Sequence, residues 1–171
     1  MGKTVGGVRT YGWRDITFQK RAAEVQRLRA SGRYSSVEMS DKGGYVAIEV
    51  STRAHKAEEI EAARILADKG YKVILKDEAG DESTVDGYVF ALSYEQRTPT
   101  GSGRWNCGNA LAHARSKRAD VALIYDKYHK YHKETVRQGI IDYERLYPDW
   151  RFRFILVISS EGAVHRWKHD G

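Results

Sequence analysis

Carboxylates in the middle of the chain have the types and spacing that could hold a divalent metal ion. Asp86 and Glu95 lie nine residues apart in a segment expected to be extended, and a group of helix glutamates, Glu58, Glu59 and Glu61, lies upstream. Mg²⁺ takes one or two carboxylates together with waters and phosphate oxygens, so ligands that converge from separate elements could bind it. A metal ion held there can activate water and stabilise charge at phosphorus. The pattern therefore indicates phosphodiester hydrolysis.

A cation accompanies the last of these carboxylates. Arg97 follows Glu95 by two residues, so both side chains are expected on one face of a strand. It could orient the attacking water or hold the phosphate. Ordinary structural interpretations stay open: a glutamate in the first turn of a helix stabilises the helix dipole, an aspartate beside a glycine suits a bulge, and Glu95 with Arg97 could be an exposed edge pair.

Alternating helices and strands must position these side chains. Helices are expected at residues 16–30, 56–69, 106–117 and 127–146, and strands at 45–51, 71–75, 83–94 (one hairpin strand or two short strands around Gly87), 120–125, 152–158 and 163–167. Asp15 is the expected N-cap of the first helix, and residues 1–14 are expected to form a loose arm. This order predicts an α/β class, with a mixed β-sheet flanked by helices.

Length, charge and cysteine content narrow the function classes. A chain of 171 residues fits one compact domain, and no run approaches the roughly 18 apolar residues of a membrane span. The single cysteine excludes an intramolecular disulfide framework and a Cys-cluster zinc site. The net charge of +6 divides into +5 for residues 1–45, −5 for 46–96 and +6 for 97–171. An acidic centre between basic flanks suits a nuclease, because carboxylates gather the cation while Lys and Arg meet phosphates; an unevenly charged solvated surface is the alternative.

Several short runs resemble a known family in their order along the chain. They are Gly43-Gly-Tyr-Val46, residues 59–73, Val85-Asp86-Gly87, Tyr94-Glu-Gln-Arg97, Asn109-Ala-Leu111 with Ala114, and Arg118-Ala-Asp-Val121. Together they resemble the C-terminal tRNA nuclease domain of CdiA-type contact-dependent growth inhibition toxins, which has a PD-(D/E)xK, restriction-endonuclease-like core. The resemblance covers roughly residues 43–125, with weaker agreement to the end of the chain, and its motifs are short and degenerate.

The resemblance implies a site and a domain organisation. It implies Glu59, Asp86 and Glu95 as metal ligands and, together with Arg97, as the catalytic residues. The implied cofactor is a divalent metal ion, foremost Mg²⁺, with Mn²⁺ or Zn²⁺ as alternatives. Residues 43–171 would form the nuclease domain, and residues 1–42 would form an N-terminal arm and a basic amphipathic helix.

The sequence departs from the family pattern at positions that bear on catalysis. Arg97 replaces the lysine of the motif; arginine can clamp a phosphate with two hydrogen bonds, but it is permanently charged and cannot act as a base. Val85 replaces the usual proline, and Lys117 or Arg118 takes the place of a glutamine. Two alternatives follow: a catalytically impaired nucleic-acid-binding module of the same fold, or a DNA-cutting restriction-like nuclease.

The expected function is a metal-dependent endoribonuclease that cleaves tRNA-like RNA as a bacterial toxin module. The resemblance implies action in the cytoplasm of the producing or target bacterial cell, delivery within a larger secreted protein, and a cognate immunity protein as partner. Basic residues of the C-terminal half are the expected contacts to RNA, and tyrosines between lysines in residues 125–133 offer stacking faces. These cations are Arg104, Lys117, Arg118, Lys130 and Lys133.

Histidines and the cysteine are weaker candidates. His129 and His132 have a spacing that can bind metal, but neighbouring lysines oppose a cation and favour a basic aromatic surface. His113 and His165 could support acid–base cleavage of RNA, although their separation in sequence gives this no support. Cys107 lacks a visible partner base and is expected to be a buried thiol.

Overall fold

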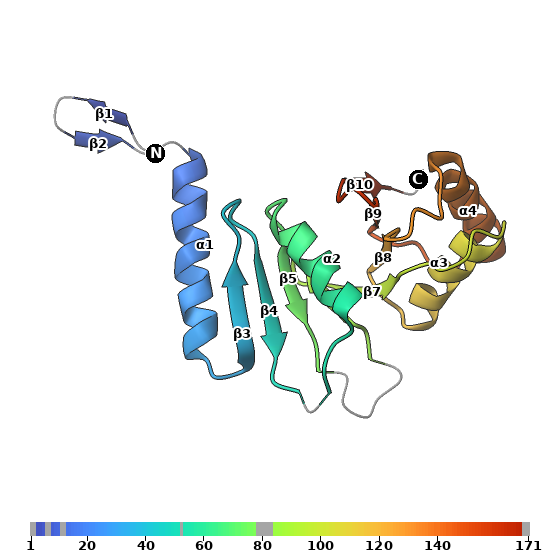
Figure 1. The fold of residues 1–171 in the computed structure, drawn as a ribbon, viewed down its shortest axis with the longest axis horizontal. Helices are drawn as coiled ribbons and strands as arrows, with labels where there is room; N and C mark the ends of the chain where they lie inside the picture. Colours follow the sequence, from blue (N-terminus) through green and yellow to red (C-terminus); the bar gives the residue numbers. More distant parts are fainter. Residues whose placement is uncertain (1–2, 6–7, 11–12, 52, 78–83, 169–171) are drawn as a thin grey trace.

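The computed structural model describes residues 3–5, 8–10, 13–51, 53–77 and 84–168, and an eight-stranded mixed sheet with helices forms its centre (Figure 1). The strand order across the sheet is β10-β9-β8-β7-β6-β5-β4-β3. Its strands are β3 (Tyr34–Met39), β4 (Tyr45–Glu49), β5 (Lys72–Leu75), β6 (Gly87–Val89), β7 (Leu92–Arg97), β8 (Val121–Tyr125), β9 (Phe154–Ile158) and β10 (Val164–Trp167). The helices of the described residues are α1 (Trp13–Ala30), α2 (Ala57–Ala67), α3 (Asn106–Ser116) and α4 (Lys133–Leu146). The predicted α/β class is confirmed.

A parallel block at one end of the sheet carries the candidate site. β7 pairs parallel with β8, and β8 pairs parallel with β9. β4 and β5 form the other parallel pair, and the remaining neighbours are antiparallel. The carboxyl ends of β7, β8 and β9 therefore meet at one edge, where ligands of open α/β sheets commonly bind.

Helix α2 covers the middle of one face of the sheet. Its buried side chains, Ala62, Ala63 and Leu66, pack in a core with alternate residues of the strands, among them Val73 and Leu123. Gly70 follows the helix with a positive φ of 89°, the conformation in which glycine ends helices. The predicted helix at 56–69 and the strand after it are confirmed, since burial of this periodic apolar face drives both.

The opposite face is covered at its two ends. Val25 of α1 packs with Val37 and Ala47 at the β3–β4 end. Leu111 of α3 and Ile140 of α4 pack with Ile124 and other residues of β8 and β9. Successive residues of β8 point alternately into this core and into the core under α2, so the two cores lie on opposite faces of the sheet. Figure 1 shows α1 and the α3–α4 pair at opposite ends of the molecule, with α2 between them.

A close approach joins α3 to α4. A Cβ atom on Gly139 would lie 2.6 Å from Cβ and Sγ of Cys107, so only glycine fits this contact. Cys107 is fully buried, as expected, and burial raises the pKa of its thiol to about 12. This packing fixes α3 against the sheet, and α3 supplies part of the site.

Several local predictions were wrong. The N-terminal arm contains a two-stranded sheet, β1 (Lys3–Val5) with β2 (Val8–Thr10), and α1 begins at Trp13, so Asp15 is inside the helix instead of capping it. The polar segment before residue 40 forms β3, which pairs with β4 across the predicted domain boundary at 42/43. An edge strand can have few apolar residues, which explains why the sequence pattern of β3 did not predict a strand.

Two further boundaries differ. β6 and β7 turn at Phe90 and Ala91, with φ of 48° and 65°, instead of around Gly87. This is a two-residue hairpin turn whose positive φ values normally require Gly or Asn, so its sequence carries no turn signal. Helix α4 begins at Lys133, and residues 127–132 form a loop. Within the described residues, no helix combines the length and the apolar character needed to cross a membrane.

Candidate active site

A pair of carboxylates lies where the β6–β7 hairpin meets α3. Gly87 pairs with Tyr94, so Asp86 and Glu95, the residues just beyond, come side by side. The backbone N–H of Gln96 donates a hydrogen bond of 2.7 Å to Oδ2 of Asp86. Glu95 is 4% exposed, and its Oε2 atom has no hydrogen-bond partner. The hairpin thus brings together two of the three predicted carboxylates and leaves one buried oxygen unsatisfied.

The electrostatics of the pair favour a proton or a cation between the two groups. Burial, together with the neighbouring Asp86 carboxylate, raises the pKa of Glu95 well above its ordinary value. The positive charges of Lys117 and Arg97 oppose this shift without cancelling it. At neutral pH and without a bound cation, Glu95 therefore holds a proton.

His113 of α3 faces this pair. Its Nε2 lies 3.6 Å from Oε2 of Glu95. Burial and the charges of Arg97 and Lys117 lower the pKa of His113, so its imidazole is neutral at pH 7. The contact is therefore between a neutral imidazole and a protonated carboxyl group, and it is not an ion pair. An uncharged imidazole beside a carboxylate pair can accept a proton.

Arg97 lies at the carboxyl end of β7 and opens onto a polar pocket. The pocket has a volume of about 230 Å³, and its lining combines Arg97 with loop residues and the first turns of α3. Asn106, Asn109 and Thr100 contribute amide and hydroxyl groups to it. A guanidinium among neutral donors is suited to phosphate, because it presents several N–H groups in a fixed plane. The sequence prediction that Arg97 shares the face of Glu95 agrees with this arrangement.

Glu59 occupies a different environment. It is 7% exposed, and its carboxylate accepts a hydrogen bond of 3.3 Å from the backbone N–H of Lys56 at the start of α2. Nδ1 of His55 lies 3.2 Å from the same carboxylate. The side-chain amide of Gln96 donates to the carbonyl of Glu58, which places the start of α2 on the face of β7 opposite to Glu95. The hydrogen bonds of Glu59 in the described structure are thus within its own helix terminus.

Glu58 and Glu61, the other two helix candidates, also have their own environments. Glu61 forms an ion pair with Lys127, with Nζ 2.9 Å from Oε2, and accepts a hydrogen bond from the hydroxyl of Tyr125. Glu58 lies in the first turn of α2, where its charge stabilises the helix dipole. Glu59 is the buried member of the three, as expected for the residue that faces the sheet.

The residues present fit a divalent cation in part. Asp86 and Glu95 offer carboxylate oxygens, the ligand type of Mg²⁺, and one of those oxygens is buried without a hydrogen-bond partner. Across the residues that the structure describes, no group of three or more His, Cys, Asp or Glu side chains lies close enough to hold a metal ion. Two carboxylates are nevertheless the number from which Mg²⁺ is commonly bound, with water and substrate phosphate supplying the other ligands.

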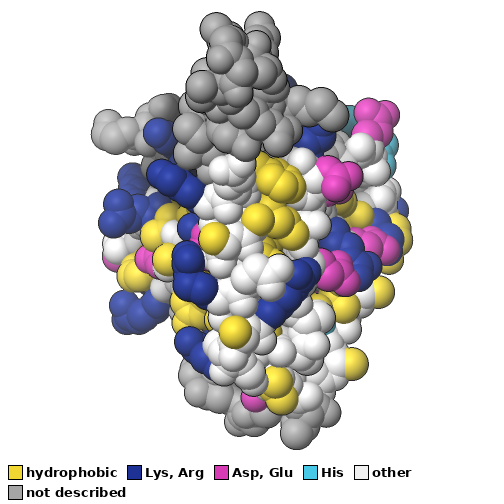
Figure 2. Space-filling model, turned by 90° about the vertical axis from the view of Figure 1, so that its left-hand side faces the viewer, with side chains coloured by type: hydrophobic (Ala, Val, Ile, Leu, Met, Phe, Trp, Pro, Cys, Tyr) yellow, Lys and Arg dark blue, Asp and Glu magenta, His cyan; other side chains and the backbone are white. Residues whose placement is uncertain are grey.

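The cations predicted to contact RNA lie around this end of the molecule. Lys117 is the C-cap of α3, four residues after His113, and its charge acts on Glu95. Arg104 and Arg118 stack over the rings of Trp105 and Trp150, at 5.0 and 5.8 Å from their centroids. Lys130 and Lys133 are exposed at the start of α4. Figure 2 shows the opposite end of the molecule, beside α1, where Lys and Arg side chains also gather on the surface.

The sequence reasoning did not place His113 beside Glu95. His113 and Lys117 are four residues apart on one helix, so they share a face, and that spacing was the signal that could have grouped them. What the spacing could not give is the partner, because Glu95 reaches His113 through tertiary packing. The histidines His129 and His132 lie in a loop, with ring centroids 6.0 Å apart.

Comparison with known proteins supports the fold. No family model matches the chain, and no curated protein matches its sequence. A solved structure described as the CdiA-CT/CdiI toxin and immunity complex from Burkholderia pseudomallei is similar, with a TM-score of 0.50 and 15% sequence identity. The match covers 70% of this chain and 93% of that chain. The fold resembles a CdiA-CT toxin domain.

Proposed function

We propose that the protein is a metal-dependent endoribonuclease that cleaves tRNA-like RNA and acts as a bacterial toxin module. The observation that carries this proposal is the Asp86–Glu95 pair, in which Glu95 is buried with one unsatisfied carboxylate oxygen, beside Arg97 and Lys117. Paired carboxylates next to cations are the arrangement that metal-assisted phosphodiester hydrolysis requires.

Each residue has a role in the proposed reaction. Asp86 and Glu95 would hold a divalent cation, foremost Mg²⁺, which when bound supplies an activated water and neutralises charge at phosphorus. Glu95 must give up its proton to serve as a ligand, because its ion-free form is protonated. Arg97 would bind the phosphate with its guanidinium, and His113 would accept at Nε2 the proton that the attacking water loses. Arg97 orients the phosphate and does not act as a base, because its guanidinium is permanently charged.

In this proposal Glu59 supports the site through the first turn of α2, and its role as a metal ligand is implied by the family resemblance. Its hydrogen bonds hold the first turn of α2, and the side chain of Gln96, next to Glu95, is bonded to that same turn. A direct metal contact would require Glu59 to leave His55 and the Lys56 backbone. The predicted three-carboxylate set therefore rests on the family resemblance for this member.

The class of substrate and the biological setting rest on resemblance. The order of short motifs resembles CdiA-type tRNA nuclease domains, and the fold likeness is to a toxin solved in complex with its immunity protein. We infer a cognate immunity protein for this chain and delivery as part of a larger CdiA-like protein. The exposed cations around the site, Lys130 and Lys133 among them, are suited to an RNA backbone.

Cleavage assays test the proposal directly. Purified protein is incubated with total tRNA, and separately with plasmid DNA, in Mg²⁺, in Mn²⁺ and in EDTA. The variants are Asp86→Asn and Glu95→Gln, with Glu161→Gln as a matched control because Glu161 is exposed in the β9–β10 turn. Discrete tRNA fragments are expected with the wild type and the control, and none with EDTA or with the two site variants.

The other outcomes each identify a different function. Intact RNA that still shifts on a native gel would contradict catalysis and indicate a nucleic-acid-binding module. Metal-dependent cleavage of plasmid DNA in preference to tRNA, lost in the same two variants, would indicate a DNA nuclease. Cleavage that persists in EDTA would contradict the role of the metal ion.

A further inference from the structure

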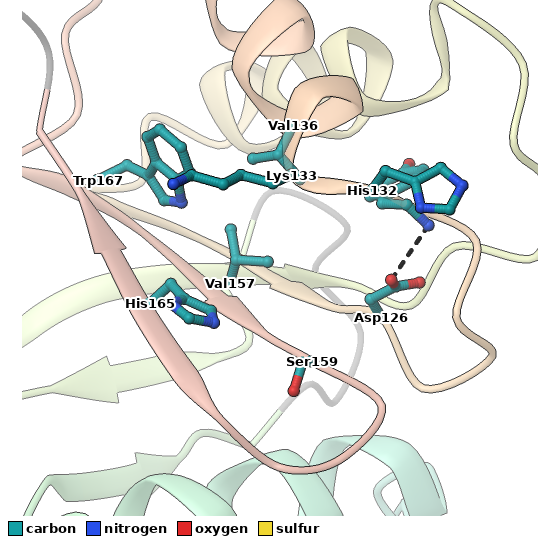
Figure 3. Close-up of a pocket in the computed structure, with 9 residues that line it drawn as sticks. Asp126, His132, Lys133, Val136, Val157, Ser159, His165 and Trp167 are labelled. Carbon is teal, nitrogen blue, oxygen red and sulfur yellow. Dashed lines mark hydrogen bonds between the residues drawn. The ribbon is translucent and has the colours of Figure 1, made fainter.

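A second pocket lies two strands from Arg97, at the same edge of the sheet. Its volume is about 200 Å³, and it is lined by residues at the ends of β8 and β9, by β10 and by the start of α4. Figure 3 shows Trp167 and His165 on one side, Asp126 and His132 on the other, and Val157 between them. Strand neighbours are about 4.8 Å apart, so β7 and β9 are separated by about 10 Å. The pocket is therefore next to the candidate active site and distinct from it.

One tyrosine forms a wall between the two pockets. Tyr131 lines both of them, and its hydroxyl donates a hydrogen bond to the side chain of Asn106 in the Arg97 pocket. The carboxylate of Asp126 accepts backbone hydrogen bonds from Lys130 and Tyr131, at 2.6 and 3.1 Å. This loop is thus held in place between the pockets, and a chain bound at Arg97 that continues along the strand ends reaches the second pocket.

The lining of the second pocket is suited to a flat aromatic group with polar edges. Val136 and Val157 give it an apolar floor, and the half-buried indole of Trp167 gives it a flat side. The hydroxyl of Ser159 accepts a hydrogen bond from the backbone of Ala163, which leaves its own proton to donate. Each oxygen of the Asp126 carboxylate, which is 4% exposed, already accepts one backbone hydrogen bond and has a second lone pair with which to accept another. An apolar slot with a donor and an acceptor is how proteins bind a base by stacking and by its edges.

The charge around the opening is positive. Lys130 and Lys133 are exposed on the α4 side, and Lys168 is exposed after β10. Figure 3 shows the Lys133 side chain extending across the opening toward Trp167. These cations would attract the phosphate of a nucleotide, a group that an uncharged aromatic ligand lacks.

We propose that this pocket is a nucleobase subsite, which holds a base of the RNA strand whose phosphate is bound at Arg97. The base would stack on Trp167 and His165 and would meet Ser159 and Asp126 at its edge, with the adjoining phosphate near Lys133. The subsite deepens the proposed ribonuclease function and rests on it for the continuity of the strand. It gives the enzyme a means of choosing the nucleotide beside the cleaved bond.

Binding of single nucleotides tests the subsite without any cleavage. Isothermal titration calorimetry measures the affinities of AMP, GMP, CMP and UMP for the wild-type protein in EDTA, with ribose 5-phosphate as the ligand without a base. The variants are Trp167→Ala and His165→Ala; His165 is exposed, so its removal leaves the core intact. Trp105→Ala is the matched control, because Trp105 is exposed and lies outside both pockets.

The expected result is base-dependent binding that needs the pocket. At least one nucleotide should bind more tightly than ribose 5-phosphate, and each pocket variant should bind it about 5- to 100-fold more weakly, the range for losing one stacked base. Trp105→Ala should bind like the wild type. Equal affinity for ribose 5-phosphate, or an equal loss in Trp105→Ala and Trp167→Ala, would overturn the subsite.

The two proposals fail in distinguishable ways. Nucleotide binding at the pocket without any RNA cleavage would support the subsite and overturn the nuclease activity. RNA cleavage by the wild type with unchanged nucleotide affinity in both pocket variants would overturn the subsite and leave the nuclease standing. If both proposals hold, Trp167→Ala and His165→Ala should raise KM for RNA and alter the preferred base beside the cleaved bond.

Discussion

Among single residues, Glu95 is a carboxyl group whose burial lowers the stability of the fold. A carboxyl group that is 4% exposed beside Asp86 cannot ionise easily, and its burial is compensated only by a proton or a cation. Such perturbed groups in clefts are typical of functional sites. His113 shows the complementary shift, since its pKa is lowered, so the proton resides on Glu95 and the imidazole is neutral.

The Glu95→Gln variant should become more stable than the wild type as the pH rises. The folded state holds the Glu95 proton to a higher pH than the unfolded chain, so the wild type loses stability as the pH rises through the raised pKa. Glutamine does not titrate. We expect an advantage for the variant on the order of 1–3 kcal/mol at pH 9, and little at pH 4, in urea unfolding with EDTA. A pH-independent difference, or the same gain in Glu161→Gln, would contradict the buried protonated carboxyl.

His113→Ala should slow cleavage without unfolding the protein. If the neutral imidazole accepts a proton in the reaction, its loss should lower kcat by roughly 100-fold or more, with KM little changed. The matched control is His129→Asn, because His129 is exposed in a loop and its φ of 53° suits asparagine. Single-turnover cleavage of tRNA measures the effect, and a kcat equal to that of the wild type would remove His113 from the mechanism.

At the scale of elements, the position of α3 decides the site. The helix carries His113 and Lys117 and lines the Arg97 pocket, and its packing on α4 depends on the close approach of Cys107 and Gly139. A small change in side-chain volume at this contact should shift α3, because protein interiors have few voids that could accommodate it.

Two glycine substitutions in this helix pair should have opposite effects. Gly139→Ala forces a Cβ to within 2.6 Å of Cys107 and should destabilise the protein by about 1–3 kcal/mol. Gly108→Ala meets only a carbonyl oxygen at 3.7 Å and should stabilise α3 by up to about 1 kcal/mol through helix propensity. Thermal unfolding of the two variants tests this, and equal shifts in Tm would show that the close approach does not constrain the packing.

At the scale of the whole molecule, the charge pattern of the sequence has a spatial counterpart. The acidic centre supplies Asp86 and Glu95, and the basic C-terminal part supplies the cations around α3 and α4. Figure 2 shows further basic side chains at the α1 end. A polyanion that binds across the site thus meets positive charge beyond the carboxylates that are proposed to hold the cation.

Removal of Lys130 and Lys133 should weaken RNA binding in a salt-dependent way. The lysine substitutions are made in the Glu95→Gln variant, which is expected to bind RNA without cleaving it. Each phosphate contact that is lost should then lower the magnitude of the slope of log affinity against log salt concentration by about 0.7. Arg64→Gln is the control, because Arg64 of α2 is paired with Glu38 of β3, with 3.1 Å between Nη2 and Oε1. Filter binding between low and moderate salt measures the slope, and an unchanged slope in the double lysine variant would place the RNA elsewhere.

Local sequence patterns predicted the α/β class, the helices α2 and α3, and the shared face of Glu95 and Arg97, whereas the β6–β7 hairpin that brings Asp86 beside Glu95 carries no turn signal. The predicted features follow from local periodicity and from the two-residue period of a strand, which are visible along the chain. The assignment of a metal ion and of RNA contacts stays a prediction. The N-terminal pair of strands, β3 and the start of α4 carry weak local signals and were not predicted.

Which side chains meet depends on the packing of helices against the sheet. Glu59 is bonded at its own helix terminus, His113 reaches Glu95, and Tyr131 stands between two pockets. The pKa shifts of Glu95 and His113 likewise depend on burial and on charges from other elements. The physical reason is that such contacts join residues distant in sequence, and their energies are set by packing between helix and sheet, which no local pattern encodes.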